Sequence, residues 1–478
     1  MRLFAILLLT LSARAAVVEG VILDQETGNP LARTEVALMP LPGTSATITP
    51  VRTGARGSFV ILSVTPGWYI LRATRRGYAA AESGQVRPGR PGHAFQVADD
   101  RSAGFLEIRM SRLPAITGAV LDENGVGIPK WQVFVYSARK PVRRAAKGVT
   151  DERGNFRIGE LDPGAYLVRS GPGLLEDQTT LIATYAKAAT EIADAIPLNV
   201  HAGETVHDVV IRPLRGHLFT ISGTLLPVPK CFANLTLVTD TDRREIASGG
   251  DPTPFSATGV QPGPVEIIVK GKDLTGKECG SYTRLVVTDK DISSLRLACG
   301  PFEKLSVTVT GGTLKSPLVV RRVDLDGASE SHPLVPNEIL APGHWELSVP
   351  TTSDYYAFAV RNQFGPPLAR NGAWYGFDAG TYTRLWVQLS PRPASISGVV
   401  STRGNPVAGA PIFLRDKDSG QTWTGRADPQ GNYRMQGLAP GAYTIISGFD
   451  LDPDAIKPDD VATAEGGNTV HPLELVLP

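Results

Sequence analysis

Two histidine–glutamate pairs have the spacing that metallopeptidases use for zinc. His201 and Glu204 stand in the string HAGE, and His471 and Glu474 stand in the string HPLE. Imidazole nitrogen and carboxylate oxygen are ordinary zinc ligands, so each pair could supply part of a catalytic site. Both strings fall at a turn or closing strand of a β-rich stretch, and the other five histidines are scattered singly. We therefore predict no metal site and no cofactor.

An acidic run near the C-terminus has residue types that could bind calcium. The run FDLDPDAIKPDD begins at Phe449 and places Asp450, Asp452 and Asp454 two residues apart. Carboxylate oxygens are calcium ligands, but an EF-hand loop also needs a glycine after the third aspartate and a glutamate further on. The run has neither, which favours a solvated acidic loop.

An aromatic stretch is the strongest candidate for ligand binding. The segment RNGAWYGFDAGTY contains Trp374, Tyr375 and Phe377, with Arg370 and Asn371 just before them. Rings on a glycine-rich loop can form a flat platform for a sugar or another ligand, with the arginine and asparagine as polar partners. The alternative is that the rings cover the end of a hydrophobic core.

The sequence shows no catalytic motif in a convincing context. The sequence has no nucleophile elbow, no glycine-rich phosphate loop and no recognisable pair of carboxylates for acid–base chemistry. We therefore predict that the protein is not an enzyme. A hydrolase with an unrecognised site stays open as a lesser alternative.

The three cysteines, Cys231, Cys279 and Cys299, lie in one stretch of the chain. The run TRLVVTDKDISSLRLAC resembles two strands joined by a turn at Thr288–Asp291, which would place Cys279 roughly opposite Cys299. We predict a disulfide between these two residues. The alternative is that all three are small buried side chains.

Proline–glycine pairs repeat along the chain, and their spacing indicates the domains on which the candidate residues above lie. Successive pairs are 97, 99, 80 and 98 residues apart, which is the length of one small sandwich domain. The prolines are Pro66, Pro163, Pro262, Pro342 and Pro440.

Each pair stands between two apolar positions. The residues seven before the proline are Phe59, Phe156, Phe255, Val335 and Tyr433, and those three after it are Tyr69, Tyr166, Val265, Trp345 and Tyr443. Alternation at period two after each pair predicts a strand with one face against a second sheet. Proline and glycine in this order favour a type II turn before the strand.

The repeats predict an all-β chain of about five tandem Ig-like or transthyretin-like seven-stranded β-sandwiches. The predicted ranges are 16–113, 114–216, 217–301, 302–393 and 394–478, with the fourth repeat degenerate. Apolar residues at spacings of three and four also predict a short helical insert over 180–196 in the second sandwich.

The N-terminus resembles a secretory signal peptide over residues 1–15. Arg2 precedes the apolar run Leu3–Leu11, and Ala13 and Ala15 have the small-x-small spacing of a cleavage site. We expect an exported protein that is periplasmic, extracellular or associated with the cell surface, with no stable membrane insertion. The 48 Lys and Arg residues balance 47 Asp and Glu residues, so no nucleic-acid partner is expected.

The motifs G-x-V-x-D, D-x-x-G-x-F and L-x-P-G-x-Y resemble those of the carboxypeptidase regulatory-like domain. The match is strongest in the second and fifth repeats. Its residues are Gly118, Asp122, Gly125, Asp151, Gly154, Pro163, Gly164 and Tyr166, and then Gly398, Pro406, Asp428, Gly431, Pro440, Gly441 and Tyr443. The resemblance implies a transthyretin-like sandwich, related to collagen-adhesin B-type repeats and starch-binding-like modules, that serves as a non-catalytic accessory or surface module.

We therefore expect a structural or interaction protein, a rod of sandwiches that contacts a protein or polysaccharide surface. The alternative function is carbohydrate binding, which the segment around Trp374 and the starch-binding-like relatives favour.

Overall fold

The structure is a computed structural model that describes residues 16–46, 48–98, 103–138, 142–227, 231–249, 252–302, 304–363, 365–379, 383–451 and 457–476, apart from the side chains of Pro227 and Cys231. The regular elements in these ranges are strands, and no helix among them could span a membrane. The predicted signal peptide lies outside the described residues, as do Asp452 and Asp454 of the acidic run.

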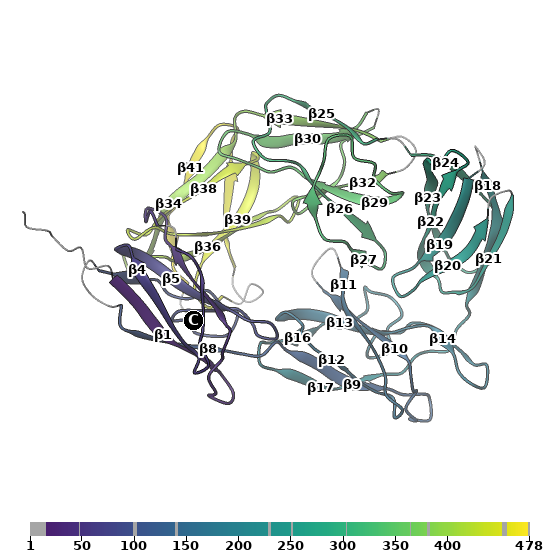
Figure 1. Cartoon of the computed structure of the whole chain (residues 1–478), viewed down its shortest axis with the longest axis horizontal. Helices are drawn as coiled ribbons and strands as arrows, with labels where there is room; N and C mark the ends of the chain where they lie inside the picture. The colour runs from purple at the N-terminus through teal and green to yellow at the C-terminus, as the bar shows by residue number, and fades with distance from the viewer. Residues whose placement is uncertain are drawn as a thin grey trace, which may run out of the picture.

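Five tandem β-sandwiches make up the described chain, so the all-β prediction is confirmed (Figure 1). Sandwich 1 comprises β1 (Ala16–Asp24), β2 (Glu35–Pro40), β3 (Val51–Arg52), β4 (Ser58–Val64), β5 (Gly67–Thr74), β6 (Ala81–Glu82), β7 (Phe95–Val97) and β8 (Phe105–Met110). Sandwich 2 comprises β9 (Ala115–Val120), β10 (Gln132–Ser137), β11 (Arg143–Val149), β12 (Asn155–Ile158), β13 (Gly164–Ser170), β14 (Gly173–Leu174), β15 (Thr180–Leu181), β16 (Leu198–Val200) and β17 (Thr205–Ile211).

The third and fourth sandwiches follow. Sandwich 3 comprises β18 (Phe219–Pro227), β19 (Cys231–Val238), β20 (Arg243–Gly249), β21 (Thr253–Val260), β22 (Gly263–Asp273), β23 (Glu278–Val287) and β24 (Ile292–Pro301). Sandwich 4 comprises β25 (Ser306–Thr310), β26 (Val319–Asp324), β27 (Gly327–Ala328), β28 (His332–Pro333), β29 (Gly343–Ser348), β30 (Tyr356–Asn362), β31 (Arg370–Asn371), β32 (Trp374–Ala379) and β33 (Arg384–Ser390).

The fifth sandwich ends the chain. It comprises β34 (Ala394–Thr402), β35 (Asn405–Pro406), β36 (Pro411–Asp416), β37 (Thr422–Arg426), β38 (Asn432–Leu438), β39 (Gly441–Ser447), β40 (Asp459–Thr463), β41 (Asn468–Val470) and β42 (Leu473–Glu474). Every sandwich has a main hydrophobic core drawn from its own strands. The predicted divisions of the chain stay a prediction, which this separation of the cores supports.

The opening strand is the centre of one layer in four of the sandwiches. β1, β9, β18 and β34 each pair antiparallel with the strand that precedes the proline–glycine pair, and parallel with the closing strand. In sandwich 4 the closing strand β33 is central instead, with β25 at the edge. The degenerate fourth repeat therefore differs in topology as well as in sequence.

A glycine in each of these four opening strands permits a close approach of the neighbouring backbone. A Cβ atom on Gly118 would lie 1.9 Å from the carbonyl oxygen of Val209 and 2.9 Å from the ring of Phe156. Equivalent contacts to a carbonyl oxygen, at 2.0 to 2.1 Å, exist at Gly20, Gly223 and Gly398. A side chain there would collide with backbone that cannot move aside.

In four of the five repeats, an aromatic residue three positions after the proline donates a hydrogen bond to the carbonyl oxygen of the residue just before that proline. The hydroxyl of Tyr166 donates to the carbonyl oxygen of Asp162, the residue before the proline, at 2.6 Å. Tyr69, Tyr443 and Trp345 make the same contact in sandwiches 1, 5 and 4. The repeated aromatic position thus fixes the start of the strand as well as filling the core.

The predicted type II turn is wrong at three of the five proline–glycine pairs, whereas Gly263 and Gly343 of the third and fourth pairs do have a positive φ, of 134° and 155°. Gly67, Gly164 and Gly441 begin strands β5, β13 and β39 and are absent from the described residues with a positive φ, whereas a type II turn needs a positive φ at its third residue. The positive φ belongs to the upstream turns instead, where Gly154 and Gly431 have φ of 79° and 78°.

The helix predicted over 180–196 is also wrong. The segment forms β15 and then irregular turns, and both Lys187 and Ala188 have a positive φ that an α-helix excludes. Tyr185, Ala189 and Ala195 of this segment pack on the outer face of the sheet in sandwich 2, where the rings of Tyr185 and Tyr136 lie 6.4 Å apart. Tertiary packing therefore decides the conformation against the local helical spacing.

The five sandwiches form a closed ring and not the expected rod. Figure 1 shows the chain running from the purple sandwich 1 through blue, teal and green back to the yellow sandwich 5, which lies beside sandwich 1. Arg426 of sandwich 5 pairs with Glu82 of sandwich 1 at 2.6 Å, although 344 residues separate them. Contacts between the first and last repeats were not accessible from local sequence patterns.

Candidate functional site

The predicted aromatic platform is divided between the core and the surface. Tyr375 and Phe377 are only 6% and 3% exposed and belong to the core of sandwich 4. Trp374 is half-buried on the other side of the same strand, with the guanidinium carbon of Arg321 3.9 Å from its ring centre. The three rings therefore do not form one surface, and ligand binding at Trp374 stays a prediction.

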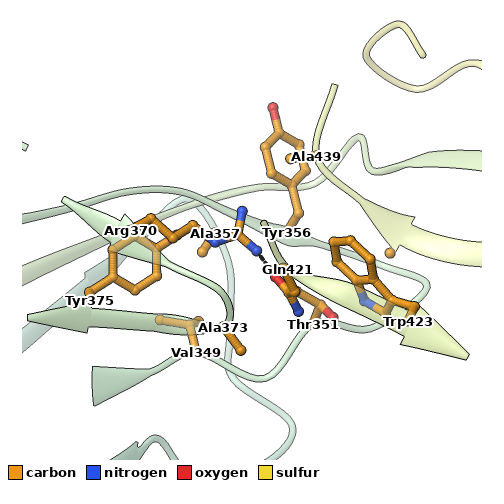
Figure 2. Close-up of a pocket in the computed structure, with 11 residues that line it drawn as sticks. Val349, Thr351, Tyr356, Ala357, Arg370, Ala373, Tyr375, Gln421, Trp423 and Ala439 are labelled. Atoms are coloured by element: carbon orange, nitrogen blue, oxygen red, sulfur yellow. Dashed lines mark hydrogen bonds between the residues drawn. The ribbon is translucent and has the colours of Figure 1, made fainter. Parts of the chain in front are cut away.

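The predicted polar partners lie on β31. Arg370 reaches the side-chain amide of Gln421 in sandwich 5, as Figure 2 shows, and lies 3.8 Å from the carboxylate of Asp416. The cavity beside them has a volume of about 20 Å³, room for about one water molecule. Asn371 is exposed. Arg370 therefore joins two sandwiches instead of lining a ligand pocket.

The two histidine–glutamate strings make local contacts. His201 Nδ1 lies 2.8 Å from a carboxylate oxygen of Glu204, and His471 Nε2 lies 3.2 Å from Asp459. Glu474 instead accepts the backbone N–H of Arg403. Across the described ranges, no three His, Cys, Asp or Glu side chains are grouped to hold a metal ion.

The predicted disulfide between Cys279 and Cys299 does not form. β23 and β24 pair antiparallel, but only at the ends away from their connecting turn, and the register pairs Cys279 with Pro301, so Cys299 falls two residues away. Cys279 is disulfide-bonded, whereas Cys299 is a buried thiol whose pKa burial raises to about 11. The side chain of Cys231 lies outside the described part of the chain.

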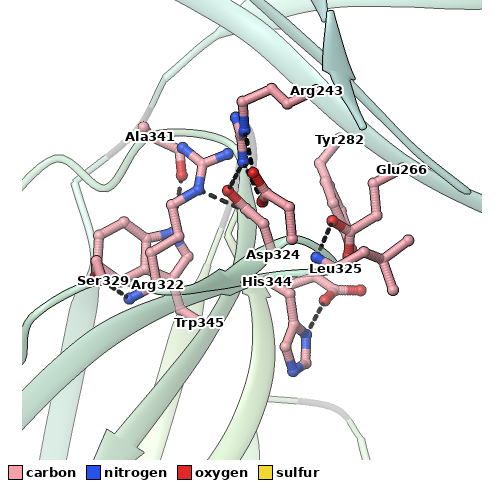
Figure 3. A network of polar contacts seen from close by, with 12 residues as sticks. Arg243, Glu266, Tyr282, Arg322, Asp324, Leu325, Ser329, Ala341, His344 and Trp345 are labelled. Carbon is pink, nitrogen blue, oxygen red and sulfur yellow. Dashed lines mark hydrogen bonds and ion pairs between the residues drawn. The ribbon is translucent and has the colours of Figure 1, made fainter. Parts of the chain in front are cut away.

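Sandwiches 3 and 4 are joined through a hairpin that carries two aspartates (Figure 3). Arg243 of sandwich 3 forms ion pairs with both Asp324 and Asp326 at the end of β26. Glu266, only 1% exposed, accepts the backbone N–H of Leu325 between them at 2.9 Å. Charge-assisted hydrogen bonds to Arg243 and to Glu266 of sandwich 3 therefore hold the hairpin tip of sandwich 4.

Sandwich 2 meets the same region. Arg169 pairs with Asp240 of sandwich 3, and Arg144 donates to the Asp240 carbonyl oxygen at 3.1 Å. Arg143 pairs with Glu346 of sandwich 4 at 2.7 Å. We call this meeting point of sandwiches 2, 3 and 4 the central junction.

The central junction is a region of paired charges at neutral pH. Hydrogen bonds from Arg243 to Asp326 and Asp324 raise the pKa of the guanidinium, although burial lowers it. Burial raises the pKa of Asp326, but the hydrogen bond and charge of Arg243 outweigh it and leave that pKa below its ordinary value. Both groups are therefore ionised together over a wide pH range.

A second group of contacts joins the two ends of the chain, and we call it the closing contact. In addition to the pair of Arg426 with Glu82, Arg426 donates to the carbonyl oxygens of Gly92 and Gly409 at 2.8 and 2.9 Å. Asp450, whose side chain is 6% exposed, pairs with Arg87 at 2.7 Å.

Aromatic packing completes the closing contact. The rings of His93 and Phe449 stack with their centres 3.8 Å apart. Burial and the nearby charge of Arg426 lower the pKa of His93. Neutral histidine therefore suits this contact better than the protonated form.

Sequence reasoning missed both junctions. Their pairs join residues that are tens to hundreds of positions apart, so no local spacing reveals them. One signal was present: three Arg-Arg dipeptides, beginning at Arg143, Arg243 and Arg321, all lie at the central junction. A fourth, beginning at Arg75, does not take part in these pairs, so the signal was not specific.

Comparison with known families finds a similarity in two of the sandwiches. The carboxypeptidase regulatory-like domain matches residues 17–98 and 395–450, which lie in sandwiches 1 and 5. These two parts of the chain are similar to the carboxypeptidase regulatory-like domain, and the match to sandwich 5 agrees with the motifs, whereas sandwich 2, where the motifs were also strongest, is not among the matched ranges. No curated protein matches the chain.

Solved structures resemble the chain only distantly. The TIE protein of Bacillus anthracis is 12% identical with a TM-score of 0.18, over 96% of this chain and 74% of its own. The minor pilin of Streptococcus agalactiae is 13% identical with a TM-score of 0.26, over 42% of this chain and 97% of its own. The shaft pilin SpaA of Lactobacillus rhamnosus GG is 9% identical with a TM-score of 0.25, over 42% and 98%.

Proposed function

We propose that this protein is an exported, non-catalytic scaffold that holds five sandwiches in a ring and presents their outer surfaces to a protein or polysaccharide partner. The closing contact carries the proposal, because a half-buried arginine and an aromatic stack fix the two ends of the chain together. A protein that served only as an extended linker between two partners would gain nothing from a contact between its two ends. The regulatory-like domains at both ends support a role without catalysis.

Reversing one charge tests the scaffold. Glu82→Arg places two guanidinium groups against each other at the closing contact, whereas Glu19→Arg changes an exposed residue of the same sandwich as a matched control. Small-angle scattering should show a more extended molecule for Glu82→Arg only. Binding to isolated cell-envelope polysaccharide and protein fractions should then fall for that variant and stay unchanged for the control.

Two results would contradict the proposal. Equal binding by the opened and closed molecules would show that the ring has no role in presentation. Turnover of peptidase or glycosidase substrates by the purified protein, lost on addition of a chelator, would show that the protein is an enzyme.

Carbohydrate binding is the second candidate function, and one observation favours it. Trp386 and Phe358 are 50% and 57% exposed on the sheet formed by β25, β33 and β30. Exposed rings of this kind can stack on sugar rings. Polysaccharide pull-down should weaken for Trp386→Ala, and retention of this variant equal to that of the wild type would remove this candidate.

A further inference from the structure

A cleft lies beside the closing contact, on the outer face of sandwich 5. Its volume of about 500 Å³ falls within the range of about 300–1,000 Å³ that small-molecule sites occupy. β34 and β38 form its floor, and Pro42 of sandwich 1 contributes to its wall. The cleft is therefore bordered by both ends of the chain.

The register of the two strands brings polar and apolar side chains together on the floor. Ser397 pairs with Arg434, and Val399 pairs with Asn432 in the next row. Such cross-strand neighbours have Cβ atoms about 5 Å apart, so the four side chains lie within reach of one small ligand.

Most polar groups of this cleft already have partners. Asp428 accepts hydrogen bonds from the backbone of Gln430 and from Asn432, and Arg426 is neutralised by Glu82. The Ser397 hydroxyl is hydrogen-bonded to Asn468. Their capacity to bind a further group is small.

Arg434 differs from them. Its side chain is exposed, and its guanidinium has no ion pair or hydrogen bond to any described residue. A guanidinium group offers donors in a planar fork that matches a carboxylate. The hydrogen-bond donors that remain available in the cleft are therefore those of the Arg434 guanidinium, which favours a negatively charged acceptor.

We propose that this cleft binds a small sugar acid, with its carboxylate on Arg434 and its ring against Val399 and Pro42. The volume accommodates one or a few sugar rings, and the mixed polar and apolar floor suits a hydroxyl-bearing ring. This inference goes beyond the scaffold function and does not depend on it.

Titration calorimetry with glucuronate and glucose tests the site. The full mature chain should bind glucuronate, and glucose should bind at least about tenfold more weakly because it lacks the charged acceptor. Arg434→Gln should weaken glucuronate binding by at least about tenfold. Arg415→Gln, an exposed residue on the other sheet of sandwich 5, is the matched control and should bind as the wild type does.

The inference is overturned by any of three results: no saturable binding of glucuronate, equal binding of glucose, or unchanged binding by Arg434→Gln. Because Arg434 has no described partner, its variant should melt at the wild-type temperature, which separates loss of binding from loss of fold. The closed ring, measured by scattering, should be the same in this variant, so failure here leaves the scaffold proposal intact.

Discussion

At the scale of single residues, the turn aspartate Asp24 acts as a hydrogen-bond acceptor. Asp24 is 2% exposed, and its carboxylate accepts the backbone N–H groups of Glu26 and Thr27 and the hydroxyl of Tyr78. Burial raises the pKa of Asp24, but these hydrogen bonds outweigh it and lower the pKa to about 2. The ionised form is therefore the one that stabilises the first sandwich.

This gives a prediction for acid stability. Since the folded pKa of Asp24 lies below the ordinary value of 3.8, its contribution is present above that pH and is lost as the pH falls towards about 2. Asp24→Asn should lower the free energy of unfolding of sandwich 1 by about 2 kcal/mol at neutral pH. Urea titrations at several pH values should show the difference between the two proteins shrinking below about pH 4, and a constant difference would contradict the assignment.

At the scale of elements, the opening strand depends on its glycine. Gly118→Ala should destabilise sandwich 2 by about 1–3 kcal/mol, because its Cβ would meet the Val209 carbonyl oxygen and the Phe156 ring. Gly159→Ala is the control, since the nearest atom to its Cβ would be Ala115 Cβ at 3.7 Å, an ordinary contact. Calorimetry of the full chain should show a lowered transition for the first variant only; equal melting would refute the close-approach explanation.

Sequence reasoning at this scale succeeded where the pattern is local. Period-two alternation identified the sandwich strands, and the hairpin glycine Gly154 has the positive φ that its turn requires. It failed at the segment over 180–196, where apolar residues at helical spacing lie in a short strand and irregular turns that pack on a sheet. The aromatic candidate failed similarly, because alternation along β32 sends Tyr375 and Phe377 into the core and Trp374 to the other side.

At the scale of the whole molecule, the closing contact should respond to pH. The charged groups around it are Arg426, Glu82, Arg87, Arg90 and Asp450. The pKa of the stacked histidine in the closed ring lies below its ordinary value of 6.5, so the closed form is favoured above that pH and loses stability as the pH falls through it.

We expect the scattering radius to increase between about pH 7.5 and about pH 5.5. His93→Gln removes the titrating group, so its molecule should show a weaker dependence on pH over the same range. An identical pH response in both proteins would show that titratable groups other than His93 cause the ring to open.

The ring itself could not be predicted from the sequence. Its stability depends on pairs such as Arg143 with Glu346, which are 203 residues apart, and on a hairpin tip that fits a buried carboxylate. Such contacts are encoded in the geometry of the assembled sandwiches and not in any short motif. The sequence repeat therefore predicted the β-sandwich fold of the repeats, but it did not predict how the sandwiches pack into a ring.

The parallel pairing of opening and closing strands has a mechanical consequence. In sandwich 1, Gly20 pairs with Leu106 and Asp24 with Met110, so the chain enters at one end of the layer and leaves at the other. A pull on the two ends draws these strands past each other along their length. The hydrogen bonds between them then carry the load together, in shear, instead of opening one after another. All five sandwiches pair their opening and closing strands in parallel, which suits a protein exposed to tension.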